Sequence, residues 1–111
     1  HETVRNACHE NANVVVMSHL SHFYPQGANL YFIFIGRMDR SEFEAYHHKV
    51  VDAIYQSGAS ISHHHGIGRL LSPWYPEAAG SVAFDLLTAI KNHLDPRGLL
   101  NPGVLGLGKG N

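Results

Sequence analysis

Three consecutive histidines, His63, His64 and His65, are the side chains in this chain best suited to chemistry. A short apolar stretch, residues 59–62, precedes them, and the glycines Gly66 and Gly68 follow. Imidazole changes its charge near neutral pH, so it suits both proton transfer and metal binding. Glycine permits backbone angles and close approaches that other residues resist. We therefore expect this loop to transfer protons or to contact a ligand.

Two other interpretations of the triplet stay open. A plain solvated loop would also accept three histidines. A metal site is the other, although on an extended backbone His63 and His65 share one face and His64 takes the opposite one. A structural zinc site usually has four ligands, often with thiolates, and the chain has a single cysteine, Cys8. We therefore expect no metal at the triplet.

The composition predicts a single domain with a covered surface. The 111 residues suffice for one core. Charged residues make up 15% and hydrophobic residues 44%. The charged share is below the usual quarter, so we expect part of the surface to be covered and the chain to form a homo-oligomer. The formal net charge of −1, without a basic stripe, argues against a nucleic-acid partner.

The cysteine content and the N-terminal residues give information about the cellular compartment and about how the chain begins. A lone Cys8 excludes an internal disulfide framework and fits a reducing compartment. The sequence has no secretory signal and no apolar run long enough for a membrane span. It begins abruptly at His1, in what reads as a helix, so we expect a piece of a longer protein, truncated on its N-terminal side.

The first half of the chain reads as a helix followed by a hairpin. A short amphipathic helix to about residue 11 carries Cys8 on its apolar side, as a buried and inert thiol. Residues 13–23 form a strand whose β-branched residues on both faces indicate burial on both sides. A turn over residues 24–29 leads to the strongest strand, residues 30–35. In a simple register Tyr31 lies opposite His22, where it is either a packed aromatic or a ligand contact.

The second half reads as two helices joined by a strand and a loop. Ser41 and Glu44 predict a capping box that opens a helix over residues 41–57, and Gly58 ends it. A short strand over residues 59–62 then delivers the histidines. An irregular aromatic stretch over residues 70–76 comes before the last amphipathic helix. Its apolar face is Ala83, Leu86, Leu87, Ile90 and Leu94.

Proline and glycine shape the C-terminal end. Asp95 and the proline after it end the last helix, because the residue before proline resists helical angles. Residues 97–103 read as an ordered turn, and residues 106–110 as a fraying end. The order of elements predicts an α+β fold, a ferredoxin-like, mainly antiparallel sheet with helices on one face. No glycine-rich phosphate loop follows a strand, so the chain has no dinucleotide site of its own.

Three stretches resemble FAD-linked oxidases of the vanillyl-alcohol-oxidase type. Residues 58–69, Gly-Ala-Ser-Ile-Ser-His-His-His-Gly-Ile-Gly-Arg, look like the histidine loop of the alkyldihydroxyacetonephosphate synthases (alkylglycerone-phosphate synthases). Residues 94–103, Leu-Asp-Pro-Arg-Gly-Leu-Leu-Asn-Pro-Gly, resemble the closing motif of the wider superfamily. Residues 24–32 are similar to the aromatic strand before the histidine loop. The triple histidine is the specific part, since many relatives carry Gly-Glu-His-Gly there.

The resemblance implies that residues 1–111 are the C-terminal cap, or substrate, domain of a flavoenzyme. Its partners would be the FAD-binding domain of the same parent chain, which holds most of the FAD, and a small-molecule or lipid substrate. The synthases exchange the acyl chain of acyl-dihydroxyacetone phosphate for a fatty alcohol, the ether-forming step of ether-lipid synthesis, without net redox change. By this resemblance the isolated piece is inactive, and the parent is cytoplasmic or peripheral to a membrane.

The resemblance also assigns roles to residues. Tyr31, His63, His64 and His65 match the active-site positions as acid/base and positioning groups. By the same resemblance, His63, His65 and Asn101 contact the cofactor. Arg69 is a candidate to meet an anionic substrate, with surface solvation as the alternative.

Two other functions remain open. The tripeptide Asn-Pro-Gly at residues 101–103 is more similar to the general oxidases, so the parent could instead oxidise a hydroxy acid or an alcohol. A free-standing, histidine-rich metal-binding module is the alternative from another class.

Overall fold

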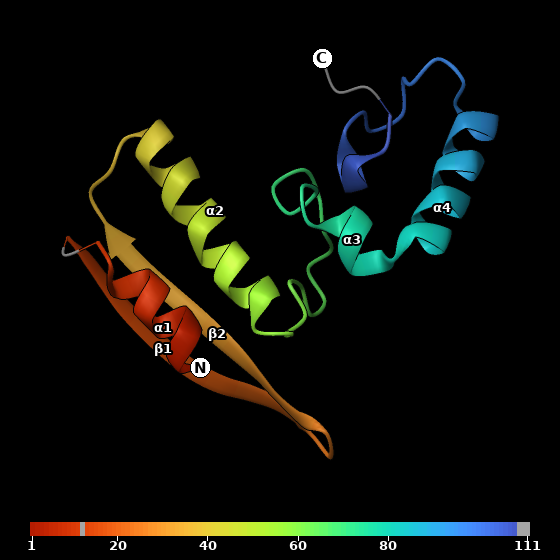
Figure 1. Ribbon diagram of the computed structural model, residues 1–111. Helices are drawn as coiled ribbons and strands as arrows, with labels where there is room; N and C mark the ends of the chain where they lie inside the picture. The colour runs from red at the N-terminus through yellow and green to blue at the C-terminus, as the bar shows by residue number, and fades with distance from the viewer. Residues whose placement is uncertain (12, 109–111) are drawn as a thin grey trace. The chain divides into compact units, whose positions relative to one another are not determined.

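A computed structural model describes residues 1–11 and 13–108, which fall into two compact units, His1–His63 and His64–Asn111. The first unit consists of a helix, a hairpin and a long second helix (Figure 1). Its elements are α1 (Glu2–His9), β1 (Val14–Tyr24), β2 (Gly27–Gly36) and α2 (Arg40–Gln56). The second unit has the elements α3 (Tyr75–Ala79), α4 (Ser81–Leu94) and the 3-10 turn η1 (Val104–Gly106). None of the described helices is long and apolar enough to cross a bilayer.

The hairpin is longer, and its turn tighter, than the sequence predicts. β1 and β2 are antiparallel, and Tyr24 pairs with Gly27, so only two residues connect the strands. The predicted longer turn over residues 24–29 is therefore wrong. The reason is that residues 27–29 satisfy their backbone groups by continuing the ladder with β1.

A β-bulge changes the predicted register near the turn. The pairing shifts between Ser21 and Phe23, and His22, the extra residue, has a left-handed φ of 52°. Tyr31 consequently pairs with His19, and the prediction that it lies opposite His22 is wrong. A bulge inserts one unpaired residue and re-aims its side chain, which a regular alternation of residues does not reveal.

The core of the first unit lies on one face of the hairpin. Figure 1 shows α1 and α2 on the same side of the two strands. The core brings together Val4, Cys8, Val14, Tyr46 and Val50. Phe34 also packs against it, with its ring centroid 5.0 Å from that of Tyr46 in an edge-to-face contact. The predicted α+β class with helices on one face of an antiparallel sheet is confirmed.

The other face of the hairpin is open. Val15 pairs with Ile35 and Met17 with Ile33, and all four side chains are exposed. Val15, for example, is 62% exposed. The prediction that this strand is buried on both sides is therefore wrong for this chain. Both helices of the unit pack on the same face, which leaves the alternate residues of each strand without cover.

Helix α2 begins one residue before the predicted start. Asp39 is its N-cap, since its carboxylate accepts from the backbone N–H of Glu42, and the Glu42 carboxylate accepts from the N–H of Asp39. The predicted box of Ser41 and Glu44 is wrong because Ser41 donates its hydroxyl to Asp39 and Glu44 pairs with Arg40. At the other end, Gly58 has a φ of 76° and donates to the carbonyl of Tyr55.

Residues 59–62 form an irregular loop, and the predicted strand is wrong. The described sheet has two strands only, so this segment has no strand partner. Locally, the Ser60 hydroxyl donates to the carbonyl of Ser62 at 2.6 Å. A side chain that bonds the nearby backbone in this way competes with an extended ladder.

The second unit is organised around the end of α4. Asp95 ends the helix, as predicted, and its buried carboxylate accepts from Lys91 at 2.6 Å and from the N–H groups of Leu99 and Leu100. Leu107 is buried, so the prediction that the chain frays from residue 106 is wrong for residues 106–108. Lys109 and Gly110, also in that predicted fraying end, lie outside the described residues.

Candidate functional site

Five aromatic and imidazole side chains gather at the turn end of the hairpin. This imidazole–phenol cluster consists of His19, His22, Tyr24, Tyr31 and His63. The rings of His19 and Tyr31 stack with centroids 4.8 Å apart and an interplanar angle of 5°. The His22 ring lies 6.2 Å from that of Tyr31 and 5.0 Å from that of His63. The Tyr24 hydroxyl is hydrogen-bonded to Nε2 of His63 at 2.8 Å.

Strand register and the bulge explain why these rings meet. His19 and Tyr31 are cross-strand partners, and side chains of directly paired residues lie on one face of a sheet. The bulge at His22 interrupts the alternation, and its ring joins the same group. This is the face that α1 and α2 leave open, so the rings are accessible: Tyr24 is 52% exposed.

His63 reaches the cluster from a different part of the chain. It follows the loop that leaves α2 at Gly58, whose left-handed backbone turns the chain at the helix end. Its bond to Tyr24 spans 39 residues of sequence. The structure thus brings together two of the predicted catalytic residues, Tyr31 and His63, within one cluster.

The rest of the triplet begins the second unit. His64 and His65 are exposed, with ring centroids 4.0 Å apart.

The remaining predicted site residues lie in loops of the second unit. Arg69 is exposed, and its backbone carbonyl accepts from Ser72. Asn101 is exposed with a left-handed φ of 46°, and its carbonyl accepts from the N–H of Val104. These contacts fix the backbone of both loops and leave both side chains at the surface.

Sequence reasoning missed His19 and Tyr24 as members of the site. A two-residue turn by itself would place Leu20 opposite Tyr31, and the register shift at the bulge brings His19 there instead, so the sequence pattern gave no direct signal for His19. For Tyr24 the signal was weak, because its partner His63 belongs to a loop whose path the sequence does not indicate. His22 was linked to Tyr31 for the wrong reason, a direct pairing in place of a bulge.

His47 and Cys8, which lie outside the cluster, have structural explanations. His47 is half-buried on α2, and burial, followed by the nearby His48, lowers its pKa. Burial also raises the pKa of the Cys8 thiol, which is fully enclosed. A thiolate is the reactive form of cysteine. Cys8 is therefore an inert core residue, as predicted.

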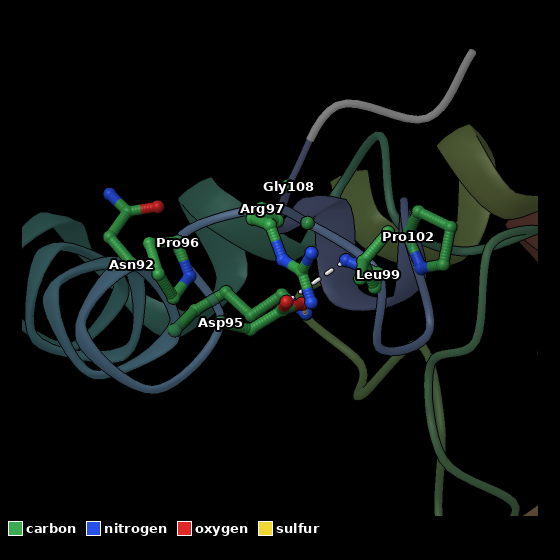
Figure 2. Close-up of a pocket in the computed structure, with 9 residues that line it drawn as sticks. Asn92, Asp95, Pro96, Arg97, Leu99, Pro102 and Gly108 are labelled. Atoms are coloured by element: carbon green, nitrogen blue, oxygen red, sulfur yellow. Dashed lines mark hydrogen bonds and ion pairs between the residues drawn. The ribbon is translucent and has the colours of Figure 1, made fainter.

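A hollow of about 650 Å³ lies in the second unit at the end of α4 (Figure 2). Figure 2 shows the Asp95 carboxylate bonded to the N–H of Leu99 within it. The Lys91 ammonium and the N–H groups of Leu100 and Leu99 hold the pKa of Asp95 down to about 2. Because these groups already occupy that carboxylate, it is a structural tie, and the hollow has a weaker chemical case than the imidazole–phenol cluster.

The residues present fit contact with the ring system of FAD better than retention of the whole cofactor. The cluster offers planar rings and hydrogen-bonding side-chain atoms, which suit a planar heterocycle. Retaining a diphosphate usually takes a glycine-rich turn from a strand into a helix. The described hairpin instead leads from β2 through a capped turn into α2 without such a loop.

The described residues contain no group of three or more histidine, cysteine, aspartate or glutamate side chains placed to hold a metal ion. Within this described part of the chain, the geometry gives no support to the alternative of a metal-binding module.

Comparison with known proteins gives a consistent family. The family "FAD linked oxidases, C-terminal domain" matches residues 1–105. The alkyldihydroxyacetonephosphate synthase of Dictyostelium discoideum is 32% identical over 94 residues, which cover 81% of this chain and 15% of that protein. The synthase of Trypanosoma brucei brucei is 32% identical over 97 residues, or 84% of this chain and 16% of that protein.

A relative with a different name matches equally well. The uncharacterized FAD-linked oxidoreductase YgcU of Escherichia coli O157:H7 is 31% identical over 105 residues, or 87% of this chain and 22% of that protein. The chain therefore spans less than a quarter of the length of these relatives. The matched residues include both the hairpin and the histidine loop. The chain belongs to the FAD-linked oxidases, within their C-terminal domain.

Proposed function

We propose that this chain is the substrate-facing part of an alkyldihydroxyacetonephosphate synthase. The observation that carries the proposal is the imidazole–phenol cluster, which combines Tyr31 and His63 on one accessible face. The synthases of Dictyostelium discoideum and Trypanosoma brucei brucei support the choice of reaction, each at 32% identity. The remainder of the active site, including most of the FAD contacts, would come from the FAD-binding domain of the parent chain.

The proposed reaction needs a proton carrier. A fatty alcohol forms a new C–O bond to the dihydroxyacetone phosphate carbon, the bond from that carbon to the acyl oxygen breaks, and the fatty acid leaves. The alcohol loses its proton, and the same proton can be returned to the departing carboxylate. Bound flavin would supply the reactive group that lets this exchange proceed without net oxidation or reduction.

The chain's own residues would hold and move that proton. Neutral imidazole takes and returns protons near neutral pH, so His63 and one of His64 and His65 are the proposed carriers. The Tyr31 hydroxyl would orient the reacting oxygen by a hydrogen bond, while its ring is kept in place by stacking on His19. Arg69 is the proposed contact for the substrate phosphate. His63, His65 and Asn101 are the proposed contacts for the cofactor.

The test uses the full-length flavoenzyme supplied with acyl-dihydroxyacetone phosphate and a fatty alcohol. We expect His64→Ala and His63→Ala each to lower the rate of ether product formation by about a hundredfold to ten-thousandfold. In His64→Ala the spectrum of the bound flavin should stay nearly unchanged. Tyr31→Phe keeps the stacked ring and removes only the hydroxyl, so it should also slow turnover. His93→Ala, on the exposed side of α4, is the matched control. Wild-type rates in all three site variants would refute the assignment.

A second candidate function is oxidation of a hydroxy acid or an alcohol by the same flavoenzyme. It is favoured by the FAD-linked oxidoreductase YgcU, at 31% identity over 105 residues. Reduction of a dye by hydroxy acids, with no ether product from the synthase substrates, would select this alternative. Ether product without dye reduction would select the synthase.

A further inference from the structure

We infer that Tyr24 is a positioning residue for His63, held in place by the hairpin turn and the bulge beside it. Its phenol would keep the His63 ring in one orientation while that ring gains and loses a proton. The inference rests on the proposed function, because it assumes that His63 carries protons.

The contact is specific in its atoms. The Tyr24 hydroxyl lies 2.8 Å from Nε2 of His63, and the ring centroids are 5.8 Å apart. Tyr24 is the last residue of β1 and pairs with Gly27, so the hairpin turn fixes its backbone. The bond therefore ties a loop histidine to a rigid element, which is the arrangement that positions a reactive group most accurately.

A phenol is suited to this role because it can both donate and accept. When Nε2 of His63 has no proton, the Tyr24 hydroxyl donates to it. When Nε2 has a proton, as in the imidazolium, that N–H donates to the phenol oxygen. The bond can thus form in either protonation state of Nε2, so it can hold the His63 ring in one orientation.

The backbone supports the same interpretation. His22 has a φ of 52°, in the left-handed region that disfavours residues other than glycine. Such strain at a bulge often accompanies a re-aimed side chain at a functional site. Here the bulge places the His22 ring 5.0 Å from the His63 ring, so His63 is confined by Tyr24 and by His22 together.

The experiment compares Tyr24→Phe with Tyr75→Phe in the full-length flavoenzyme. Tyr75→Phe removes a hydroxyl at the start of α3, outside the cluster, and is the matched control. We expect Tyr24→Phe to lower kcat by about tenfold to a hundredfold, the scale of a misoriented reacting group, with KM changed little. Because Tyr24 is largely exposed, the variant should fold normally, which circular dichroism checks.

A second measurement reports on His63 without requiring turnover. In protein labelled with ¹⁵N in histidine only, the Nε2 resonance of His63 should move in Tyr24→Phe and stay in place in Tyr75→Phe. The His63→Ala variant assigns that resonance by its disappearance.

The outcomes separate this inference from the proposed function. If His63→Ala is slow but Tyr24→Phe keeps both the wild-type kcat and the His63 resonance, the positioning role is wrong and the proposed function stands. If His63→Ala turns over normally, the proposed role of His63 fails, and the positioning inference falls with it. A moved resonance together with a lower kcat supports both.

Discussion

The two units of this chain reach a stable arrangement by different means. In the first, two helices cover one face of a hairpin, and the buried residues Cys8, Tyr46 and Val50 are at most 8% exposed. In the second, the buried set includes a charged residue, Asp95, beside Trp74 and Leu107. One unit depends on packed apolar side chains, and the other on a paired carboxylate that satisfies a helix end and a loop.

This difference indicates whether functional side chains in each unit are separate from the residues that stabilise it. The apolar core of the first unit holds the strands in place. The imidazole–phenol cluster lies on the opposite, open face of the hairpin. Its side chains can therefore contact a ligand without disturbing the core. In the second unit the hollow at the end of α4 is lined by Lys91 and Asp95, whose ion pair ties the helix end to the following loop. Substitutions should therefore separate stability from chemistry in the first unit and not at the hollow of the second.

The largest loss of stability is expected from Asp95→Asn. The change removes the charge that pairs with Lys91 and weakens the bonds to two backbone N–H groups, leaving buried polar groups poorly satisfied. Trp74, the only tryptophan in the chain, is buried in this unit, so its fluorescence reports the unfolding there. Asp85→Asn, on the exposed side of α4, is the control and should leave the midpoint unchanged.

The same carboxylate makes the stability of the second unit fall at acid pH. The pKa of Asp95 is lowered to about 2, from an ordinary value of about 3.9 in an unfolded chain. Its stabilisation is therefore present above about pH 4 and lost as the pH falls toward 2. The Trp74 midpoint in Asp95→Asn should lack this part of the acid dependence. An identical acid profile in wild type and variant would contradict the role of the carboxylate.

Next in size is Val50→Ala in the core of the first unit. Val50 is 4% exposed, and deleting its methyl groups leaves a cavity, so we expect a loss of about 2 kcal/mol in the free energy of unfolding. Val82→Ala is the matched control, since Val82 is 83% exposed. Hydrogen exchange in α2 measures the effect. Comparable losses in both variants would contradict the assigned core.

The smallest effect is expected from Tyr46→Phe. The variant keeps the packed ring and removes the hydroxyl that donates to the Cys8 carbonyl at 3.0 Å, which should cost about 1 kcal/mol. Burial, followed by the contact with Cys8, raises the pKa of Tyr46 to about 12. Its contribution is thus complete below about pH 10, the ordinary value, and is lost as the pH rises toward 12. Denaturation from pH 8 to 12 should show this loss in wild type and not in Tyr46→Phe.

The sequence by itself determined the types of α1, β1, β2, α2 and α4, and the ends marked by Gly58 and Asp95. These features follow from local chemistry: hydrophobic spacing, left-handed glycine and the restriction before proline. Residues 58–69 and 94–103 also sufficed to indicate the family that comparison confirmed.

Only the tertiary structure decided which side chains meet. The bulge at His22 shifts the register, the loop after α2 carries His63 to Tyr24, and residues 59–62 stay irregular for want of a strand partner. Each outcome depends on contacts between residues far apart in sequence, because hydrogen bonds and ring contacts are chosen among all groups that the fold brings near. Hydrophobic periodicity and short motifs give information only about residues that are close together in the sequence. The imidazole–phenol cluster therefore could not be assembled from the sequence.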